Sequence, residues 1–407
     1  MTLAVALLTR EFPPEVYGGA GVHVAELARA LAHLVDVRIH CFGGPRTSPL
    51  VARAYQPWEA LRDGTPHGAA LEAMSVDLAM AAGVTGADVV HSHTWYANLG
   101  GHLAKLLHGI PHVVTTHSLE PLRPWKAEQL GGGYALSSFC ERTALEAADA
   151  IIAVSNGMRD DVLSAYPDVD PARVRVVHNG VDTVAYRRVA PDRERLTRLG
   201  VDPARPMVLF IGRIARQKGI LHLVEAAHRL EHDAQIVLCA AAPDTDEIAR
   251  EVADGVARLR DRRDVVWLDT MLERDDAIAL MSAATVLVCP SIYEPFGLVN
   301  LEAMACELAV VATSVGGIPE VVVDGLTGSL VPLDLAPGGA PANPARFEAD
   351  LAERIDGLLG DPEQARAFGR AGRERVEREF SWGTLAATTA SIYAEVVDAA
   401  RRRSSTT

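Results

Sequence analysis

The sequence predicts an α/β protein with two doubly wound parallel sheets, and three observations carry this prediction. Short apolar runs rich in Val and Ile alternate with stretches of helical period, as in strand–helix–strand units. This alternation stops in a segment rich in Arg, Asp and Pro and begins again at residue 207. The chain has 407 residues, of which 49% are hydrophobic, so it can form two or three domains with full cores.

The predicted strands form two series along the chain. The first comprises residues 3–9, 35–42, 88–93, 112–117, 150–155 and 174–178, and the second comprises residues 207–211, 235–240, 265–268, 285–289 and 310–313. Because these runs are continuously apolar, we expect parallel sheets covered by helices on both faces. We place domains at residues 1–190 and 191–380, a C-terminal helix and tail at 381–407, and a hinge within 179–206.

The charge and cysteine content exclude several classes of protein. The 39 basic and 53 acidic residues give a formal net charge of −14, and both halves of the chain are acidic, so no nucleic-acid partner is expected. The longest charge-free stretch, residues 277–293, is shorter than the roughly 18 apolar residues of a membrane span. Residues 3–8 are too few for the apolar core of a signal peptide. Five widely spaced cysteines without a CxxC pair predict neither disulfides nor a zinc site, which fits a cytoplasmic protein.

Open parallel sheets bind ligands outside the carboxyl ends of their strands, so motifs at strand ends carry most information. The first is a glycine loop, residues 17–23, which follows the first strand and opens a helix. Glycines let a ligand approach the backbone, and the free N–H groups at a helix start favour an anion. The spacing fits neither a P-loop nor a dinucleotide fingerprint, so a simple tight turn is the alternative.

Two motifs follow strands of the second series. Arg213 and Lys218 lie between a strand and a helix predicted from Ile220, where both could reach a diphosphate, although a solvated basic loop is the alternative. Lys218 is one of only three lysines in the chain. Glu294 and Glu302 flank a Pro-Phe-Gly turn, and carboxylates suit paired hydrogen bonds from sugar hydroxyls. We expect Glu302 to lie in a helix that begins near Gly297.

Three histidines and one segment with two aspartates are further candidates. His117 ends a predicted strand, where it could contact a substrate hydroxyl or act as an ordinary core residue. His91 and His93 share a strand face but have no evident third ligand, so we expect no metal site. The segment 244–246, Asp-Thr-Asp, precedes a predicted helix and is interpreted as a helix cap.

Together these motifs resemble the retaining GT-B glycosyltransferases of family 4, which use nucleotide-activated sugars. The resemblance spans nearly the whole chain and includes the segments 179–182 (Asn-Gly-Val-Asp) and 316–320 (Gly-Gly-Ile-Pro-Glu). Within the family, segments 9–19 and 117–126 are most similar to the actinobacterial group of glycogen synthases and α-maltose-1-phosphate synthases. The resemblance implies two Rossmann-like domains facing across a cleft, with the C-terminal helices returning to the N-terminal domain.

The resemblance also implies roles for individual residues. The catalytic set would be His117, Arg213, Lys218 and Glu294, with His117 near the reacting carbon and the two cations on the diphosphate of the departing ADP. Glu302 would hold the ribose. The donor-binding set would be completed by backbone from both domains and comprises Gly19, Gly21, Arg213, Lys218, Glu294, Gly297, Leu298, Val299 and Glu302.

The implied reaction transfers glucose from ADP-glucose to α-glucose 1-phosphate, with retention of configuration and with neither a cofactor nor a metal ion. A phosphorylated acceptor needs cations, and we expect Arg123 and Lys126 to supply them, with solvated loop charges as the alternative. The main rival is a glycogen synthase with an α-1,4-glucan acceptor. A UDP-sugar 2-epimerase and a non-catalytic nucleotide-sugar sensor are alternatives of other classes. A homodimer is a possible assembly.

Overall fold

The computed structural model describes residues 2–62, 64–65, 67–123 and 125–404. These residues divide into two compact units. Unit 1 comprises the described residues up to Gly180 together with those from Trp382 onward, and unit 2 comprises Val181–Ser381. Pro124, within one of the motifs that carry the family resemblance, and residues 405–407 of the predicted tail lie outside the described residues.

Unit 1 is built on a parallel sheet of seven strands. The strand order is β3-β2-β1-β4-β5-β6-β7, and every pairing is parallel. The register pairs Val5 with Val37 on one side of β1 and with Val89 on the other. The strands are β1 (Ala4–Thr9), β2 (Asp36–Phe42), β3 (Val51–Tyr55), β4 (Val89–His93), β5 (His112–Thr116), β6 (Ala150–Ala153) and β7 (Val174–Val176).

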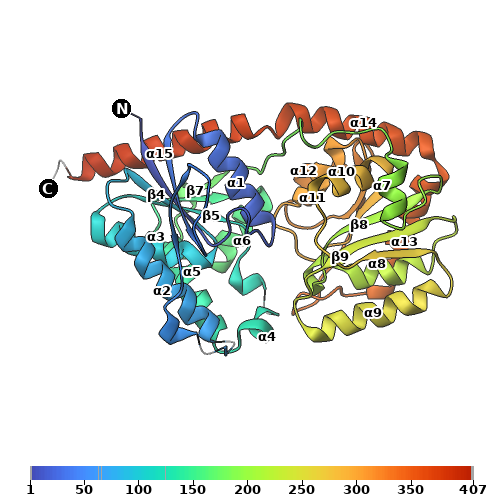
Figure 1. Ribbon diagram of the computed structural model, residues 1–407, viewed down its shortest axis with the longest axis horizontal. Coiled ribbons are helices and arrows are strands. Elements are labelled where there is room, and N and C mark those ends of the chain that lie inside the picture. The colour runs from blue at the N-terminus through green and yellow to red at the C-terminus, as the bar shows by residue number, and fades with distance from the viewer. Residues whose placement is uncertain (1, 63, 66, 124, 405–407) are drawn as a thin grey trace. The chain divides into compact units, whose positions relative to one another are not determined.

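Helices cover both faces of this sheet, as the sequence predicts (Figure 1). Successive residues of β1 point to opposite faces, so Val5 and Leu7 pack with α1 and α15, whereas Ala6 and Leu8 pack with α2 and α3. The helices of unit 1 are α1 (Gly19–Leu31), α2 (Gly68–Gly83), α3 (Trp95–His108), α4 (Lys126–Leu130), α5 (Gly133–Ala147), α6 (Asn156–Ala165) and α15 (Trp382–Ser404), with 3₁₀ turns at Glu59–Leu61, Glu120–Leu122 and Pro171–Arg173.

The C-terminal helix α15 is part of the core of unit 1, although it follows all of unit 2 in the chain. Trp382 and Tyr393 are buried in the cluster that also contains α1. The Tyr393 hydroxyl lies 2.6 Å from Nδ1 of His91 on β4. Near the end of the helix, Arg401 pairs with Asp88, and Arg403 pairs with Asp149.

Unit 2 repeats the architecture with six parallel strands in the order β10-β9-β8-β11-β12-β13. The strands are β8 (Met207–Arg213), β9 (Gln235–Ala241), β10 (Val265–Leu268), β11 (Val286–Cys289), β12 (Ala309–Thr313) and β13 (Gly328–Val331). The helices are α7 (Arg193–Arg198), α8 (Ile220–Ala227), α9 (Asp246–Arg260), α10 (Arg274–Ala283), α11 (Leu298–Ala305), α12 (Ile318–Val321), α13 (Pro344–Gly360) and α14 (Pro362–Glu379), with a 3₁₀ turn at Arg216–Lys218. Helices α8, α9 and α13 pack on one face of the sheet.

The strand order of each sheet reverses direction at one point. In unit 1 this switch point lies between β1 and β4, and in unit 2 it lies between β8 and β11. Loops that leave neighbouring strands in opposite directions open a crevice there, which is where open α/β sheets bind ligands. The two switch points are therefore the places to look for a site in each unit.

The structure corrects the sequence prediction in two respects. Strands β3 and β13 were not predicted, because both are short, partly exposed edge strands without a continuous apolar run. The boundary at residue 190/191 was ten residues too late, since unit 2 begins at Val181. The segment after Gly180 is fixed to unit 2 because Arg373 donates hydrogen bonds to the carbonyls of Thr183 and Tyr186.

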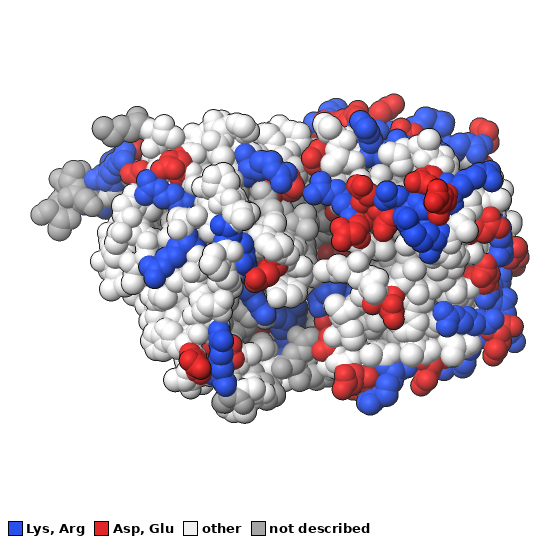
Figure 2. Space-filling view, viewed as in Figure 1, with Lys and Arg blue, Asp and Glu red and all other residues white. Residues whose placement is uncertain are grey.

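Among the described residues, no helix is long and apolar enough to cross a membrane. All five cysteines are buried and free. In the face shown in Figure 2, acidic and basic side chains are intermixed over unit 2, while much of unit 1 is uncharged. This face therefore carries no broad basic surface of the kind that binds nucleic acid.

Candidate active site

At the switch point of unit 2, the two motifs predicted from the sequence meet. Lys218 Nζ lies 2.6 Å from Glu294 Oε2, which joins the loop after β8 to the loop after β11. Gln217 strengthens the junction by donating from Nε2 to the Tyr293 carbonyl at 3.0 Å. Ser291 also donates a hydrogen bond to the Glu294 carboxylate. The most distinctive lysine and glutamate of the sequence thus form one buried-to-half-buried ion pair.

Two glycines allow these loops to approach each other. Gly219 has φ +66°, and a Cβ there would lie 1.9 Å from the Pro290 carbonyl oxygen. Gly316 has φ +53°, and a Cβ there would lie 2.1 Å from the Glu294 carbonyl oxygen. Any other residue at either position would push the loop that carries Glu294 away. The Gly-Gly-Ile-Pro-Glu segment therefore supports the backbone of Glu294.

Arg213 forms an ion pair with Asp244, which follows β9. The sequence interpretation of segment 244–246 as a cap is confirmed for one residue only. Thr245 is the N-cap of α9, and its hydroxyl accepts a hydrogen bond from the backbone N–H of Ile248. Asp244 instead faces the neighbouring strand, where it neutralises Arg213. This partner could not be found by reading local patterns, because it depends on the pairing of β8 with β9.

Glu302 lies in α11, which begins directly after Gly297, as predicted. Gly297 has φ +92° and serves as the N-cap, so the first N–H groups of the helix, including those of Leu298 and Val299, have no partner within it. Burial raises the pKa of Glu302 to about 7, and a hydrogen bond from the Tyr186 hydroxyl partly counters this rise. Tyr186 lies in the predicted hinge and was missed, because nothing in that segment distinguishes it.

In unit 1, the glycine loop follows β1 and opens α1 at Gly19, as predicted. The backbone N–H groups of Tyr17 and Gly18 donate to Glu11 Oε2 at 2.7 and 3.0 Å, so a side chain of the same unit binds these two donors. A Cβ on Gly21 would lie 2.7 Å from the same carboxylate oxygen, so Gly21 makes room for Glu11.

Four histidines cluster at the carboxyl ends of β4 and β5. His93 Nδ1 lies 3.1 Å from His117 Nε2, and the ring of His23 is 4.7 Å from that of His117. His23 Nδ1 lies 2.7 Å from the side-chain oxygen of Asn179, which begins the Asn-Gly-Val-Asp motif. Both nitrogens of His91 have partners, Tyr393 and Thr115. The predicted strand-end histidine His117 is therefore one member of a packed imidazole group.

These imidazoles are neutral at ordinary pH. Burial lowers the pKa of His23 to about 4 and lowers the pKa values of His91, His93 and His117 well below the usual value. The neighbouring histidines lower the pKa values of His91, His93 and His117 further. The sequence shows no third ligand for the pair His91 and His93; in the structure His93 instead lies with His23 and His117, and each of these three places a ring nitrogen within 4.8 Å of the others. His23 lies in α1 and His117 directly follows β5, so neither could be found from spacing along one strand.

The loop after β5 carries the two cations predicted for the acceptor phosphate. Arg123 Nη1 donates to Ser118 Oγ at 2.9 Å and lies 4.0 Å from Glu120. Lys126 is only 7% exposed, and its Nζ lies 5.6 Å from the centre of the Tyr96 ring. The structure thus holds both cations against unit 1 instead of leaving them in solvent.

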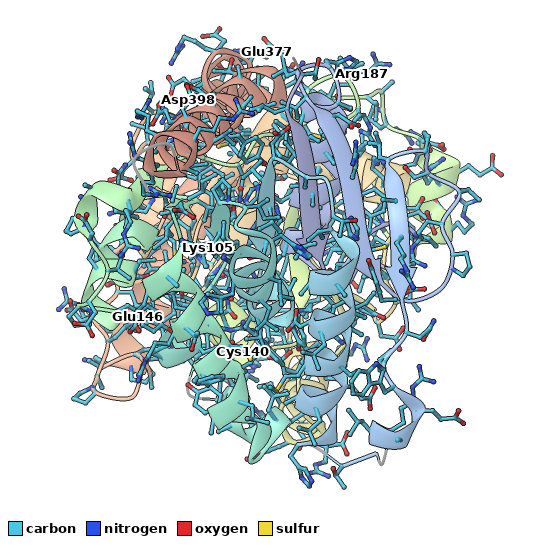
Figure 3. The ribbon with its side chains drawn as sticks, turned by 90° about the vertical axis from the view of Figure 1, so that its left-hand side faces the viewer. Lys105, Cys140, Glu146, Arg187, Glu377 and Asp398 are labelled. Atoms are coloured by element: carbon cyan, nitrogen blue, oxygen red, sulfur yellow. The ribbon has the colours of Figure 1, made fainter. Side chains whose placement is uncertain are left out.

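The third lysine has a structural role. Lys105 on α3 donates to the Ala147 carbonyl at 2.7 Å and pairs with Asp149 at 2.8 Å, so it ties α3 to the start of β6. Figure 3 shows Lys105 on its helix, well above Cys140 and Glu146 of α5. The scarcity of lysine in the sequence therefore marks one structural residue and two candidates for binding.

The chain consists of two doubly wound units, each with a switch point at which the strand order reverses. This is the architecture of the GT-B class of glycosyltransferases. Residues 17–185 match the model of Glycosyltransferase Family 4, and residues 205–361 match that of Glycosyl transferases group 1. The chain is 57% identical to the α-maltose-1-phosphate synthase of Mycolicibacterium smegmatis over 97% of its length and 100% of that protein. The chain belongs to glycosyltransferase family 4.

Other relatives are more distant. The chain is 30% identical to a glycogen synthase of Mycobacterium tuberculosis, over 96% of its own length and 94% of that protein. Its structure is similar to sucrose-phosphate synthase from Thermosynechococcus elongatus, with a TM-score of 0.76, 26% identity and coverage of 98% and 100% of the two chains. The predicted fold class and the prediction of a glycosyltransferase are therefore confirmed.

Proposed function

We propose that the protein transfers glucose from ADP-glucose to the 4-hydroxyl of α-glucose 1-phosphate, giving α-maltose 1-phosphate and ADP with retention of the α configuration. The observation that carries this proposal is the 57% identity to an α-maltose-1-phosphate synthase along essentially the whole of both chains. The product would supply α-1,4-glucan synthesis.

Donor binding falls to unit 2. Arg213 and Lys218 hold the diphosphate and stabilise the negative charge that develops on the departing ADP. Their present partners, Asp244 and Glu294, keep both cations in place before the donor arrives. When the diphosphate binds, Glu294 is free to accept hydrogen bonds from the glucose hydroxyls.

The remaining donor contacts follow from the geometry of α11 and the glycine loop. Glu302 accepts hydrogen bonds from the ribose hydroxyls in its ionised form. The backbone of Gly297, Leu298 and Val299 offers unpaired N–H groups to phosphate or sugar oxygens. We also assign Gly19 and Gly21 of the glycine loop to donor binding.

The reaction needs no protein nucleophile. The bond between the anomeric carbon and the diphosphate oxygen breaks, the acceptor 4-hydroxyl oxygen attacks from the same face, and the leaving phosphate takes the hydroxyl proton. His117, held neutral by burial, contacts the donor sugar near the reacting carbon. Because the two glutamates bind the donor, they do not act as the carboxylate pair of a glycosidase.

No metal ion or cofactor takes part in this proposal, because Arg213 and Lys218 supply the positive charge that the diphosphate requires. With all five cysteines free, we propose a cytoplasmic location. Homodimer formation is a further proposal, based only on the frequency of such symmetric pairs.

A glycogen synthase is the second candidate, favoured by the 30% identity to such an enzyme over most of both chains. The two are separated by incubating the purified protein with ADP-glucose and either α-glucose 1-phosphate or glycogen, and following ADP release and product mass. We expect a disaccharide phosphate to form much faster than glycogen is extended. Glycogen extension without any disaccharide phosphate would contradict the proposal.

A further inference from the structure

Two cations in unit 1 lie over a single aromatic side chain, and a third cation lies in the same loop as one of them. The guanidinium carbon of Arg10 lies 4.1 Å from the centre of the Tyr96 ring, and Lys126 Nζ lies 5.6 Å from the same centre. Burial raises the pKa of Tyr96, the nearby Glu120 and Glu11 also raise it, and Arg10 and Arg123, the latter in the loop that carries Lys126, lower it. Arg10 was not among the residues singled out from the sequence.

These side chains lie in segments that follow three adjacent strands. Arg10 directly follows β1, Tyr96 lies in the first turn of α3 after β4, and Lys126 follows β5. Strands β1, β4 and β5 are neighbours in the sheet, and the strand order reverses between β1 and β4. The cluster therefore occupies the switch point of unit 1, where this type of sheet binds ligands.

The two carboxylates near the cluster accept hydrogen bonds from other groups, and one of them also lies near Arg123. Glu11 accepts the backbone N–H groups of Tyr17 and Gly18. Glu120 accepts a hydrogen bond from Ser137 at 2.6 Å and lies 4.0 Å from Arg123. Among the described residues, Arg10 forms no ion pair with either, and its recorded contacts are the rings of Tyr17 and Tyr96.

Two buried N–H donors of the loop that carries Lys126 have no hydrogen-bond partner among the described residues. Arg123 Nε is buried and forms no hydrogen bond, and the same holds for the indole Nε1 of Trp125, next to Lys126. Because an unsatisfied buried donor destabilises the fold, a loop that retains two of them is suited to a ligand with several acceptor oxygens. The combination of three cations and unpaired N–H donors selects a phosphomonoester, which offers three such oxygens.

We propose that Arg10, Tyr96 and Lys126 form the binding site for the acceptor's phosphate group, with Arg10 as its principal cation. This inference rests on the proposed function, because it names the part of unit 1 that recognises glucose 1-phosphate. Tyr96 holds the Arg10 guanidinium in position through its ring, so that the fork of N–H groups is oriented before the phosphate binds. Lys126, at the start of α4, adds a second positive charge.

The test compares Arg10→Gln with Arg53→Gln, a matched control in which another arginine of unit 1 lies 5.0 Å from a tyrosine ring, that of Tyr55. For Arg10→Gln we expect the KM for α-glucose 1-phosphate to rise roughly 10- to 100-fold, with the KM for ADP-glucose changed by less than about twofold. Arg10→Lys should recover part of the loss. Arg53→Gln should behave as wild type.

An unchanged glucose 1-phosphate KM in Arg10→Gln would overturn the proposal. An equal rise in both KM values would also overturn it, since the site would then serve the donor diphosphate or the fold. Inorganic phosphate gives an independent readout on the wild-type protein, where it should compete with glucose 1-phosphate and not with ADP-glucose. If it competes with neither, the proposal fails without reference to any variant.

The proposed function can fail separately. If the wild-type protein forms no disaccharide phosphate, that function is wrong, and calorimetric titration with α-glucose 1-phosphate then decides the inference alone. Binding to wild type that is lost in Arg10→Gln would support the phosphate site. Equal binding to both proteins, or binding to neither, would overturn it.

Discussion

The two switch points differ in how they hold their positive charges. In unit 2, Arg213 and Lys218 are each paired with a carboxylate, Asp244 and Glu294. Among the described residues of unit 1, Arg10 forms no ion pair and lies over the Tyr96 ring, although Arg123 of the neighbouring loop lies 4.0 Å from Glu120. The same sheet architecture thus holds cations against carboxylates in one unit and against an aromatic ring in the other. We expect the first arrangement to match the donor diphosphate and the second to match an acceptor phosphate.

The carboxylates of unit 2 have a second task that explains the pairing. A donor brings both a diphosphate and sugar hydroxyls, so a site that contains cations and carboxylates can bind both parts once the ion pairs separate. An acceptor phosphate in unit 1 needs donors alone. We therefore expect changes to the cations of unit 2 to alter donor binding and the chemical step, and changes to the Arg10, Tyr96 and Lys126 cluster of unit 1 to alter acceptor binding.

The largest effect is expected from the cations of unit 2. Lys218→Ala and Arg213→Ala should each lower kcat by roughly 10²-fold or more, because they remove charge that stabilises the leaving diphosphate. Arg216→Ala is the matched control, since this arginine lies in the same loop and pairs with Glu251. Steady-state ADP release measures all three. Near-wild-type kcat in both Lys218→Ala and Arg213→Ala would show that these cations do not stabilise the leaving diphosphate, and the proposed contrast between the two units would fail.

A smaller and more selective effect is expected from the loop after β5. Replacing Arg123 and Lys126 together by alanine should raise the glucose 1-phosphate KM by roughly tenfold or more and leave the ADP-glucose KM nearly unchanged. Arg142→Ala, an exposed arginine on α5, provides the control. Equal effects on the two KM values would refute the assignment of this loop to the acceptor.

The pH dependence of donor binding sharpens the comparison further. Glu302 has a pKa of about 7 and must be ionised to accept ribose hydroxyls. Because a carboxyl with that pKa is mostly protonated at pH 6 and mostly ionised at pH 8, the ADP-glucose KM should be roughly five- to tenfold higher at pH 6. Glu302→Gln should have a flat profile over this range. A flat wild-type profile would show that Glu302 does not titrate in donor binding.

The same group affects stability in a defined direction. Its pKa in the folded protein lies above the usual value of 4.5, so the folded state binds the extra proton between about pH 4.5 and 7. The contribution of Glu302 to the free energy of unfolding is therefore greatest below that range and declines as pH rises through 7. The buried histidines have the opposite effect. As pH falls below 6.5 they lower the free energy of unfolding, because the folded state keeps them neutral while the unfolded state binds protons.

Metal removal is expected to have the smallest effect. Exhaustive treatment with EDTA should leave glucosyl transfer unchanged, because unit 2 neutralises the diphosphate with its own cations. The imidazole group of His23, His93 and His117 makes this test necessary, since its nitrogens are close enough to suggest a ligand set. Activity lost to EDTA and restored by a divalent cation would contradict a metal-independent transfer.

Much of the fold could be predicted from the sequence, because parallel strands buried on both faces appear as continuous apolar runs. All the strands that were missed lie at sheet edges, where half-exposed residues such as Arg53 interrupt the apolar pattern. The position of α15 could not be read from its own residues. Only the family resemblance implied a return to the N-terminal domain, and the partners of this helix in α1 lie more than 350 residues earlier in the sequence.

Candidate site residues could be predicted where they belong to a motif that is continuous in the sequence. They could not be predicted where side chains from different strands or loops meet. The Lys218–Glu294 pair joins two motifs that the sequence marked separately. The partners Asp244, Tyr186 and His23 depend on which strands and loops become neighbours, and their own sequence surroundings are ordinary. Arg10 belongs to the same category, since its significance appears only when Tyr96 is placed beside it.

If unit 1 recognises a phosphate on the acceptor, the enzyme must discriminate strongly against an acceptor that lacks one. The most direct test compares kcat/KM for α-glucose 1-phosphate and for maltose, which offers a 4-hydroxyl on a glucose residue but no phosphate. We predict a preference of roughly 10³-fold or more for the phosphorylated acceptor, equivalent to two or three charge-assisted hydrogen bonds. Comparable kcat/KM values for the two acceptors would contradict the account.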